Sequence, residues 1–303
     1  MTSAAPVQHV TVGSATQTVE LAYETFGEPS APPVLLIMGL GTQMIAWPDD
    51  LCADLVARGY YVVRFDNRDV GLSTHLHDLP APALPDLALR RRPPYTIRDL
   101  AADAAGLLDA LAIPSAHVVG ASMGGFIAQT LALRHPEKVR SLTLVMTSTG
   151  SRFVGYPRPN LVARLLRGRR AANRDEAIAA SLETFAAIGS PGFDPDVDYR
   201  SDLAGRSYDR GYNPRGYQRQ LWACVTQPNR TRRLSAVRVP TVVVHGLADP
   251  LVHVSGGKAV ARAIPGARFV GVPGMGHDLP RGVWGQLADE IAEVAARADA
   301  AEA

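Results

Sequence analysis

The pattern of hydrophobic and polar positions changes after about thirty residues. Val7–Val12 and Thr18–Thr25 show strand-like alternation of polar and apolar residues, and the turn-forming Gly13-Ser14 separates them. From Pro33 onward, short apolar runs alternate with longer segments whose apolar residues keep helical spacing. Because parallel strands need crossover connections that are usually helices, this order predicts an α/β protein with a mostly parallel sheet.

Six further strands are predicted, of which the first three are apolar runs typical of strands buried on both faces. They are Pro33–Met38, Tyr60–Phe65, Ala116–Gly120, Ser141–Met146, Thr241–His245 and Arg268–Val272. The helices predicted between and after them are Trp47–Arg58, Ile97–Leu111, Met123–Arg134, Gly256–Ala263 and Trp284 to about Arg297. Thr96 stands where an N-cap is needed and Gly59 where a helix ends. The proline-rich Leu79–Pro94 is expected to be a loop, and the tail Ala298–Ala303 is expected to fray.

About ninety residues, 148–238, separate the sixth predicted strand from the seventh and contain no convincing strand. Four helices are predicted there: Asn160–Leu166, Arg174–Ile188, Asp198–Tyr208 and Pro214–Thr226. A connection of this length inside a compact domain usually has a role of its own. We therefore expect a catalytic core formed by residues 1–147 and 239–303, with residues 148–238 inserted over one edge of the sheet as a helical cap.

The net charge of the chain conceals a difference between these two regions. The 303 residues are 47% hydrophobic and 20% charged, and the overall charge of +2 does not suggest a nucleic-acid partner. Residues 148–238, however, contain 16 arginines, no lysine and eight acidic residues, a charge of +8, which leaves 15 basic and 21 acidic residues, or −6, for the remainder. Solvated helix faces are the favoured explanation of the arginines, and attraction of anionic substrates is the alternative.

The cysteines and the hydropathy of the chain indicate in which compartment the protein is expected. Cys52 and Cys224 are too few for a disulfide framework and lack metal-ligand spacing, so two reduced thiols are expected. Met1–Val10 lacks the pattern of a secretory signal, and no apolar run approaches the roughly 20 residues of a membrane span. We expect a soluble, cytoplasmic protein, monomeric or homodimeric, that uses no metal or organic cofactor.

The most informative motif is Gly120-Ala121-Ser122-Met123-Gly124, which lies between a predicted strand and a predicted helix. A G-x-S-x-G sequence in that context is typical of a nucleophile elbow, in which Gly120 and Gly124 allow a tight turn that exposes Ser122. A serine hydroxyl needs a base to become nucleophilic. Among eight histidines, His277 is the best candidate, because its loop follows a strand and lies at the same carboxyl edge as Ser122.

The base needs a carboxylate to orient it, and two are available. Asp249 follows the strand Thr241–His245, whereas Asp278 adjoins His277 and would have to fold back to reach it. Asp249 is therefore preferred, and the chain order Ser122, Asp249, His277 is that of α/β-hydrolases. The loop Met38–Gly41 follows the third strand, so the backbone N–H groups of Leu40 and Met123 are the expected oxyanion-hole donors.

Over almost its whole length the chain resembles capped α/β-hydrolases, within which it is similar to bacterial serine esterases related to aclacinomycin methylesterase. The segments that carry the resemblance are Met38–Gln43 with Trp47-Pro48, Asp66–Ser73, His117–Gly125 and His135–Leu142. The resemblance implies an eight-stranded, mostly parallel sheet flanked by helices, with the cap after the sixth strand, and it assigns the triad to Ser122, Asp249 and His277. Many relatives have His-Gly where this chain has Met38-Gly39, a difference that leaves backbone donors intact.

The expected reaction is hydrolysis of a small-molecule carboxylic ester, such as a methyl ester, through an acyl-enzyme. Neutral His277 is required as the base, so activity should fall at acidic pH. The same triad would also serve a C–C bond hydrolase, an acyltransferase or an amidase, and a ligand receptor with vestigial turnover is a further alternative. Nine aromatic residues of the cap are helix-packing candidates, of which a few would line a pocket for a bulky apolar group: Phe153, Tyr156, Phe185, Phe193, Tyr199, Tyr208, Tyr212, Tyr217 and Trp222.

Overall fold

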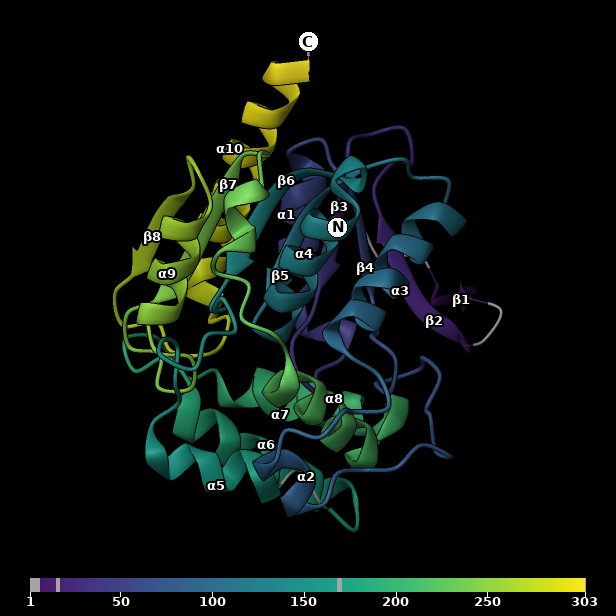
Figure 1. Cartoon of the computed structure of the whole chain (residues 1–303), viewed down its shortest axis with the longest axis vertical. Helices are drawn as coiled ribbons and strands as arrows, with labels where there is room; N and C mark the ends of the chain where they lie inside the picture. Colours follow the sequence, from purple (N-terminus) through teal and green to yellow (C-terminus); the bar gives the residue numbers. More distant parts are fainter. Residues whose placement is uncertain (1–5, 15–16, 168–170, 303) are drawn as a thin grey trace.

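A computed structural model of the chain describes residues 6–14, 17–167 and 171–302. Its centre is an eight-stranded sheet in the order β1-β2-β4-β3-β5-β6-β7-β8 (Figure 1). The strands are β1 (Gln8–Ser14), β2 (Gln17–Phe26), β3 (Pro33–Ile37), β4 (Tyr61–Phe65), β5 (Ala116–Ala121), β6 (Val139–Val145), β7 (Thr241–Gly246) and β8 (Arg268–Val272). β2 pairs antiparallel with both β1 and β4, and all other neighbours are parallel. The predicted fold class and its largely parallel sheet are confirmed.

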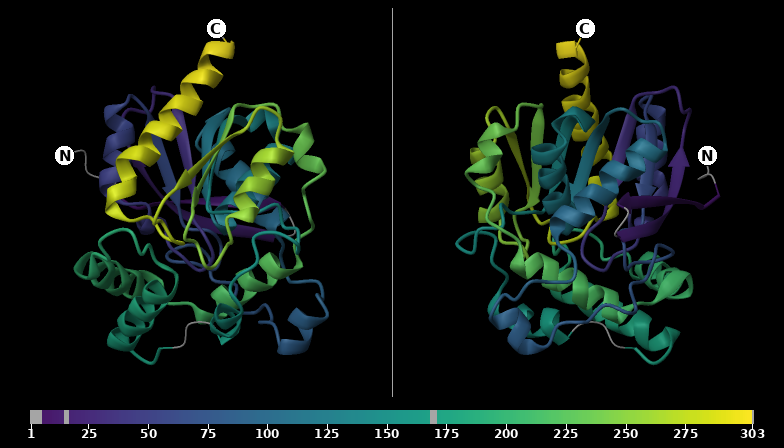
Figure 2. Two further views of the ribbon diagram at one scale, coloured as in Figure 1. Left: turned by 90° about the vertical axis from the view of Figure 1, so that its left-hand side faces the viewer. Right: turned by 45° about the vertical axis from the view of Figure 1, so that its right-hand side comes forward.

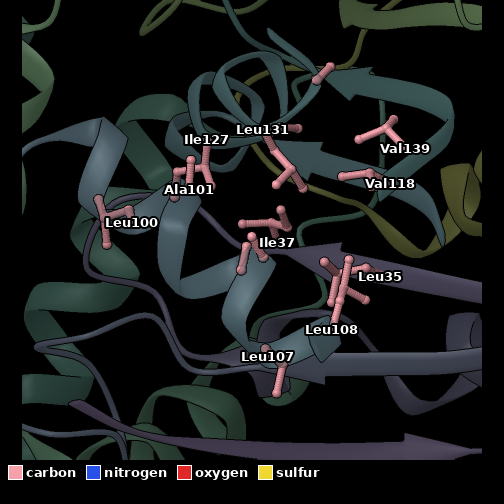
Figure 3. Close-up of a cluster of buried hydrophobic side chains, with 14 of the residues drawn as sticks. Leu35, Ile37, Leu100, Ala101, Leu107, Leu108, Val118, Ile127, Leu131 and Val139 are labelled. Carbon is pink, nitrogen blue, oxygen red and sulfur yellow. The ribbon is translucent and has the colours of Figure 1, made fainter. Parts of the chain in front are cut away.

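Helices cover both faces of the sheet, as the alternating sequence pattern predicts. On one face lie α3 (Ile97–Ala110), α4 (Met123–Arg134) and α9 (Ser255–Ala263), and on the other α1 (Asp49–Ala57) and α10 (Trp284–Glu302). Between the sheet and helices α3 and α4 lies a hydrophobic core (Figure 3). In it, Leu35, Ile37 and Val118 of the sheet pack against Leu107, Leu108 and Leu131 of the two helices. Thr96 caps α3 by accepting a hydrogen bond from Arg98 N, as predicted.

Four helices connect β6 to β7: α5 (Pro159–Arg167), α6 (Arg174–Ile188), α7 (Val197–Gly211) and α8 (Pro214–Thr226). Figures 1 and 2 show them gathered at one end of the sheet, opposite the end at which α10 finishes. Ser122, which directly follows β5, lines a cavity together with residues of α5, α6 and α7, so this end holds the carboxyl ends of the parallel strands. We refer to residues 148–238 as the helical segment.

Three sequence expectations are wrong. Gly13 and Ser14, expected to form the turn between the first two strands, belong to β1 and pair with Thr18 and Gln17 of β2. The proline-rich stretch Leu79–Pro94, expected to be a loop, contains a short helix, α2 (Leu84–Ala88), because Pro85 fits the first turn of a helix and Asp86 accepts a hydrogen bond from Ala83 N. The alanine-rich tail does not fray at Ala298: α10 continues to Glu302, as the high helix propensity of alanine favours, and Ala303 lies outside the described residues. Within the described ranges no helix combines the length and apolarity needed to cross a bilayer.

Candidate active site

Ser122 occupies a strained turn between β5 and α4. Its backbone angles, φ 55° and ψ −114°, are ones that residues other than glycine rarely adopt. The turn is tight enough that a Cβ at Gly120 would lie 2.3 Å from the Gly124 carbonyl oxygen, and one at Gly124 would lie 2.0 Å from that of Ile37. The two glycines of the motif are therefore sterically required. Strain of this kind is typical of a turn that has to expose one side chain.

The structure brings Ser122, His277 and Asp249 into one hydrogen-bonded row. His277 Nε2 lies 3.0 Å from Ser122 Oγ, and His277 Nδ1 lies 2.7 Å from Asp249 Oδ2. Because a carboxylate only accepts hydrogen bonds, Nδ1 carries the ring proton and Nε2 is left to accept the serine hydroxyl hydrogen. All three residues follow strands of the sheet, β5, β7 and β8, so the parallel topology places Ser122 at one edge with two residues more than a hundred positions away in the chain.

Asp249 is held in place from its own loop and from β7. Its Oδ1 accepts hydrogen bonds from the N–H groups of Leu251 and Val252, both at 2.8 Å, which leaves Oδ2 for His277. A second histidine, His245, lies 3.5 Å from Oδ2 and directs its Nε2 to the Val252 carbonyl oxygen. Burial lowers the pKa of His245, so this ring stays neutral at physiological pH and does not compete for the carboxylate.

Asp278, the alternative partner weighed for His277, faces the helical segment instead. Its carboxylate pairs with Arg200 of α7 and accepts a hydrogen bond from the Ser190 hydroxyl. Ser190 Oγ also accepts a hydrogen bond from Gly276 N at 2.8 Å, and the backbone N–H of His277 donates to the Ile188 carbonyl oxygen at 2.7 Å. The loop between α6 and α7 thus holds the loop that carries His277.

Sequence reasoning did not identify this contact between the two loops. The sequence shows only that each loop has two glycines, and the structure shows that the backbones of the two loops approach closely there. A Cβ at Gly276 would lie 2.1 Å from the Gly189 carbonyl oxygen, and one at Gly192 would lie 2.6 Å from Gly274 Cα. Nothing in the sequence, however, pairs one loop with the other.

Of the two residues whose backbone amides are expected to form an oxyanion hole, Met123 directly follows Ser122 in the chain and Leu40 lines the same cavity as Ser122. No acceptor is found in the described parts of the chain for the N–H of Leu40 or of Met123. The loop that carries Leu40 is fixed by two side chains: Gln220 of α8 accepts from Gly41 N at 2.8 Å, and Asn67 donates to the Met38 carbonyl oxygen at 3.1 Å. These two hydrogen bonds therefore hold the backbone around the Leu40 N–H in place.

A cavity of about 370 Å³ lies between the sheet edge and the helical segment, with Ser122 and His277 in its wall. Its lining is mainly aliphatic and aromatic, and both the core and helices α5, α6, α7 and α8 contribute to it: Met38, Leu40, Ala46, Met146, Leu161, Leu165, Phe185, Ile188, Tyr199, Leu203, Tyr217, Leu251 and Leu279. A cavity of this size suits a drug-sized apolar ligand.

The arrangement offers acid–base and nucleophilic chemistry. Among the described residues no cluster of three or more His, Cys, Asp or Glu side chains could hold a metal ion. Cys52 and Cys224 are free thiols, and burial raises the pKa of each to about 12, so neither is a thiolate nucleophile.

Comparisons with known proteins agree with this architecture. Residues 32–280 match a family model described as the alpha/beta hydrolase fold. The chain is similar to rhodomycin D methylesterase from Streptomyces peucetius, at 31% identity over 90% of this chain and 94% of the relative. The enzyme of the same name from Streptomyces sp. (strain C5) is 30% identical over the same shares of the two chains.

Solved structures support the fold. An esterase from Rhodococcus sp. ECU1013 superposes with a TM-score of 0.72 at 21% identity, covering 97% of this chain and 98% of that one. A hydrolase from Pseudomonas aeruginosa superposes with a TM-score of 0.69 at 24% identity, covering 97% and 98%. The chain therefore belongs to the α/β-hydrolase family, as an enzyme related to ester hydrolases.

Proposed function

We propose that this enzyme is a serine carboxylic-ester hydrolase that works through an acyl-enzyme. The observation that carries the proposal is the row from Asp249 through His277 to Ser122, with 2.7 Å and 3.0 Å contacts, in the wall of an apolar cavity. A base within hydrogen-bond reach of a serine, itself oriented by a carboxylate, is the arrangement that acyl transfer requires.

In the proposed mechanism Ser122 Oγ attacks the ester carbonyl carbon while His277 Nε2 takes the hydroxyl proton. The N–H groups of Leu40 and Met123 bind the oxygen that becomes negatively charged in the tetrahedral intermediate. Asp249 stabilises the imidazolium, which then protonates the departing alcohol. Water attacks the acyl-enzyme while His277 takes one of its protons, and His277 then returns that proton to Ser122 Oγ as the acid leaves.

The proposed substrate is an ester, such as a methyl ester, of a bulky apolar acid. Two observations support this choice: the cavity is lined mainly by apolar side chains, and two of the curated relatives at 30–31% identity are named methylesterases. We further propose that residues 1–147 and 239–303 act as the catalytic core and that residues 148–238 act as a cap that shapes the acyl pocket.

The first prediction tests the nucleophile. Ser122→Ala should lower kcat for a methyl ester of a polycyclic acid by about 10⁴-fold or more, because a triad without its nucleophile retains only binding and oxyanion stabilisation. The measurement is steady-state release of the acid, with Ser207→Ala as the matched control, since the Ser207 hydroxyl donates only to the Leu203 carbonyl oxygen.

The same assay separates the alternatives. Amides, activated C–C substrates such as β-diketones, and acyl transfer to added alcohols are measured beside the esters. Wild-type turnover in Ser122→Ala would overturn the proposed mechanism. Faster turnover of an amide or a diketone than of every ester would replace ester hydrolysis with that reaction.

A further inference from the structure

Four charged side chains line the cavity, and they form two pairs that differ in exposure. Arg164 of α5 and Glu183 of α6 are solvent-exposed and lie 3.8 Å apart. Arg200 and Asp278 are buried, with only 9% of Arg200 and 4% of Asp278 exposed. A buried guanidinium is costly, so its presence in a mainly apolar cavity calls for a specific explanation.

The Arg200 guanidinium is fixed from three directions. Its Nη2 pairs with Asp278, its Nε donates to the Pro195 carbonyl oxygen, and its plane lies over the Phe185 ring with Cζ 4.3 Å from the ring centre. Asp278 is itself held by Ser190. These contacts leave the group little freedom to rotate, so its remaining N–H groups point in a set direction.

The nitrogen that remains is Nη1, and in the described parts of the chain it has no hydrogen-bond acceptor. Some side-chain nitrogens of the described residues are fully buried and have no hydrogen-bond partner, but Nη1 of Arg200 is not among them. Arg200 lines the cavity, and Nη1 is the guanidinium nitrogen that its contacts with Pro195 and Asp278 leave for a ligand there. A charged donor that gains an acceptor only when ligand is bound contributes to recognition.

We propose that Arg200 is a specificity-determining residue, whose Nη1 donates a hydrogen bond to a neutral oxygen, such as a ketone or hydroxyl, on the body of the substrate. A carboxylate is the less suitable acceptor because Asp278 already neutralises the guanidinium, and a second anion would lie beside a buried one. The inference rests on the proposed ester hydrolysis, and it adds to the apolar cavity a requirement for one polar feature.

The test uses pairs of esters that differ in one oxygen. Methyl esters of fluorene-carboxylic acids are compared with those of the matching 9-fluorenone acids, in which a carbonyl replaces the CH₂ group at nearly constant shape. The positional isomers place that carbonyl at different points of the cavity. For at least one isomer, wild-type kcat/KM should favour the fluorenone ester by about tenfold, the value of one hydrogen bond to a charged donor.

The variant that tests the residue is Arg200→Met, in which the tenfold preference should fall to about twofold or less. Because this change leaves Asp278 without its counter-ion, Arg200→Met/Asp278→Asn is measured as well, so that a folding defect does not decide the result. Arg206→Met is the matched control. Arg206 also lies on α7, but it is exposed and pairs with Asp202, so the preference should persist.

The outcomes separate this inference from the proposed function. If every ester is hydrolysed but no fluorenone isomer is favoured by more than about twofold, the inference fails while ester hydrolysis stands. A tenfold preference that survives in both Arg200 variants also overturns it. If no ester is hydrolysed at all, the proposed function fails, and direct binding of the fluorene and fluorenone acids, measured by calorimetry with the same variants, decides the role of Arg200.

Discussion

The sheet-based core and the helical segment have opposite charges, and the structure shows where part of that difference is used. The core carries −6 and the helical segment +8. Three arginines of the segment form buried or half-buried ion pairs with core aspartates: Arg200 with Asp278, Arg210 with Asp66 and Arg219 with Asp69. Opposite charge is therefore a means of attaching one region to the other.

The favoured expectation that the arginines lie on solvated helix faces holds for part of the set only. Arg206 and Arg215 are exposed, whereas Arg219 is completely buried. Its Nη2 and Nε donate to the two carboxylate oxygens of Asp69, at 2.7 Å and 2.8 Å. The opposite net charges of the two regions indicate that they meet at an interface. The burial of each ion pair, however, decides how much that pair matters for stability. Surface pairs contribute little to stability, and buried pairs are costly to break.

The largest effect is expected from breaking one cross-region pair. Burial would raise the pKa of Asp69, but the hydrogen bonds from Arg219, Leu76 N and Tyr95 outweigh it and lower that pKa. Arg219→Met leaves this carboxylate buried without its cation, and the free energy of unfolding should fall by about 3–5 kcal/mol. Urea unfolding measures the loss.

Arg219→Met/Asp69→Asn provides the control, because it removes both charges. It should recover a large part of the lost stability. Asparagine tolerates the positive φ of 70° at this position. A single variant as stable as wild type would show that the pair does not attach the segment to the core.

A smaller effect is expected where the helical segment touches the loop of His277. Ser190→Ala leaves Gly276 N and one oxygen of Asp278 without a partner, a loss of about 1–3 kcal/mol in stability. If the contact positions His277, kcat should fall about tenfold with KM little changed, at a temperature well below Tm. Ser207→Ala is the control, and an unchanged kcat in Ser190→Ala would restrict the contact to a structural role.

The smallest effect concerns the core alone and depends on pH. Burial lowers the pKa of His245 below its ordinary 6.5, so the unfolded chain binds this proton more readily than the folded one. The contribution of neutral His245 to the free energy of unfolding is complete above about pH 6.5. It is lost as the pH falls from there toward the lower pKa of the folded state, by at most about 1.4 kcal/mol per pH unit. His245→Gln should unfold with a flatter dependence on pH between about pH 7 and pH 5. Parallel wild-type and variant curves would contradict it.

Much of the fold followed from local sequence signals, because those signals have local causes. Apolar runs of five or six residues gave the buried parallel strands, and helical periodicity gave α4, α6 and α8 with the bounds that the structure has. The motif around Ser122 places a serine after β5, since two glycines at fixed spacing permit one turn. The short helix α2 escaped prediction because prolines obscure its single turn.

The candidate site was predictable only as far as strand order brings residues together. Ser122, Asp249 and His277 each follow a parallel strand, and a sequence pattern alone identifies that shared edge. Which partner each arginine of the helical segment takes, and that Ser190 would contact the loop of His277, depend on how helices pack across the edge. Such pairings join residues 78 to 150 positions apart, so no local propensity encodes them, and only the tertiary structure decides them.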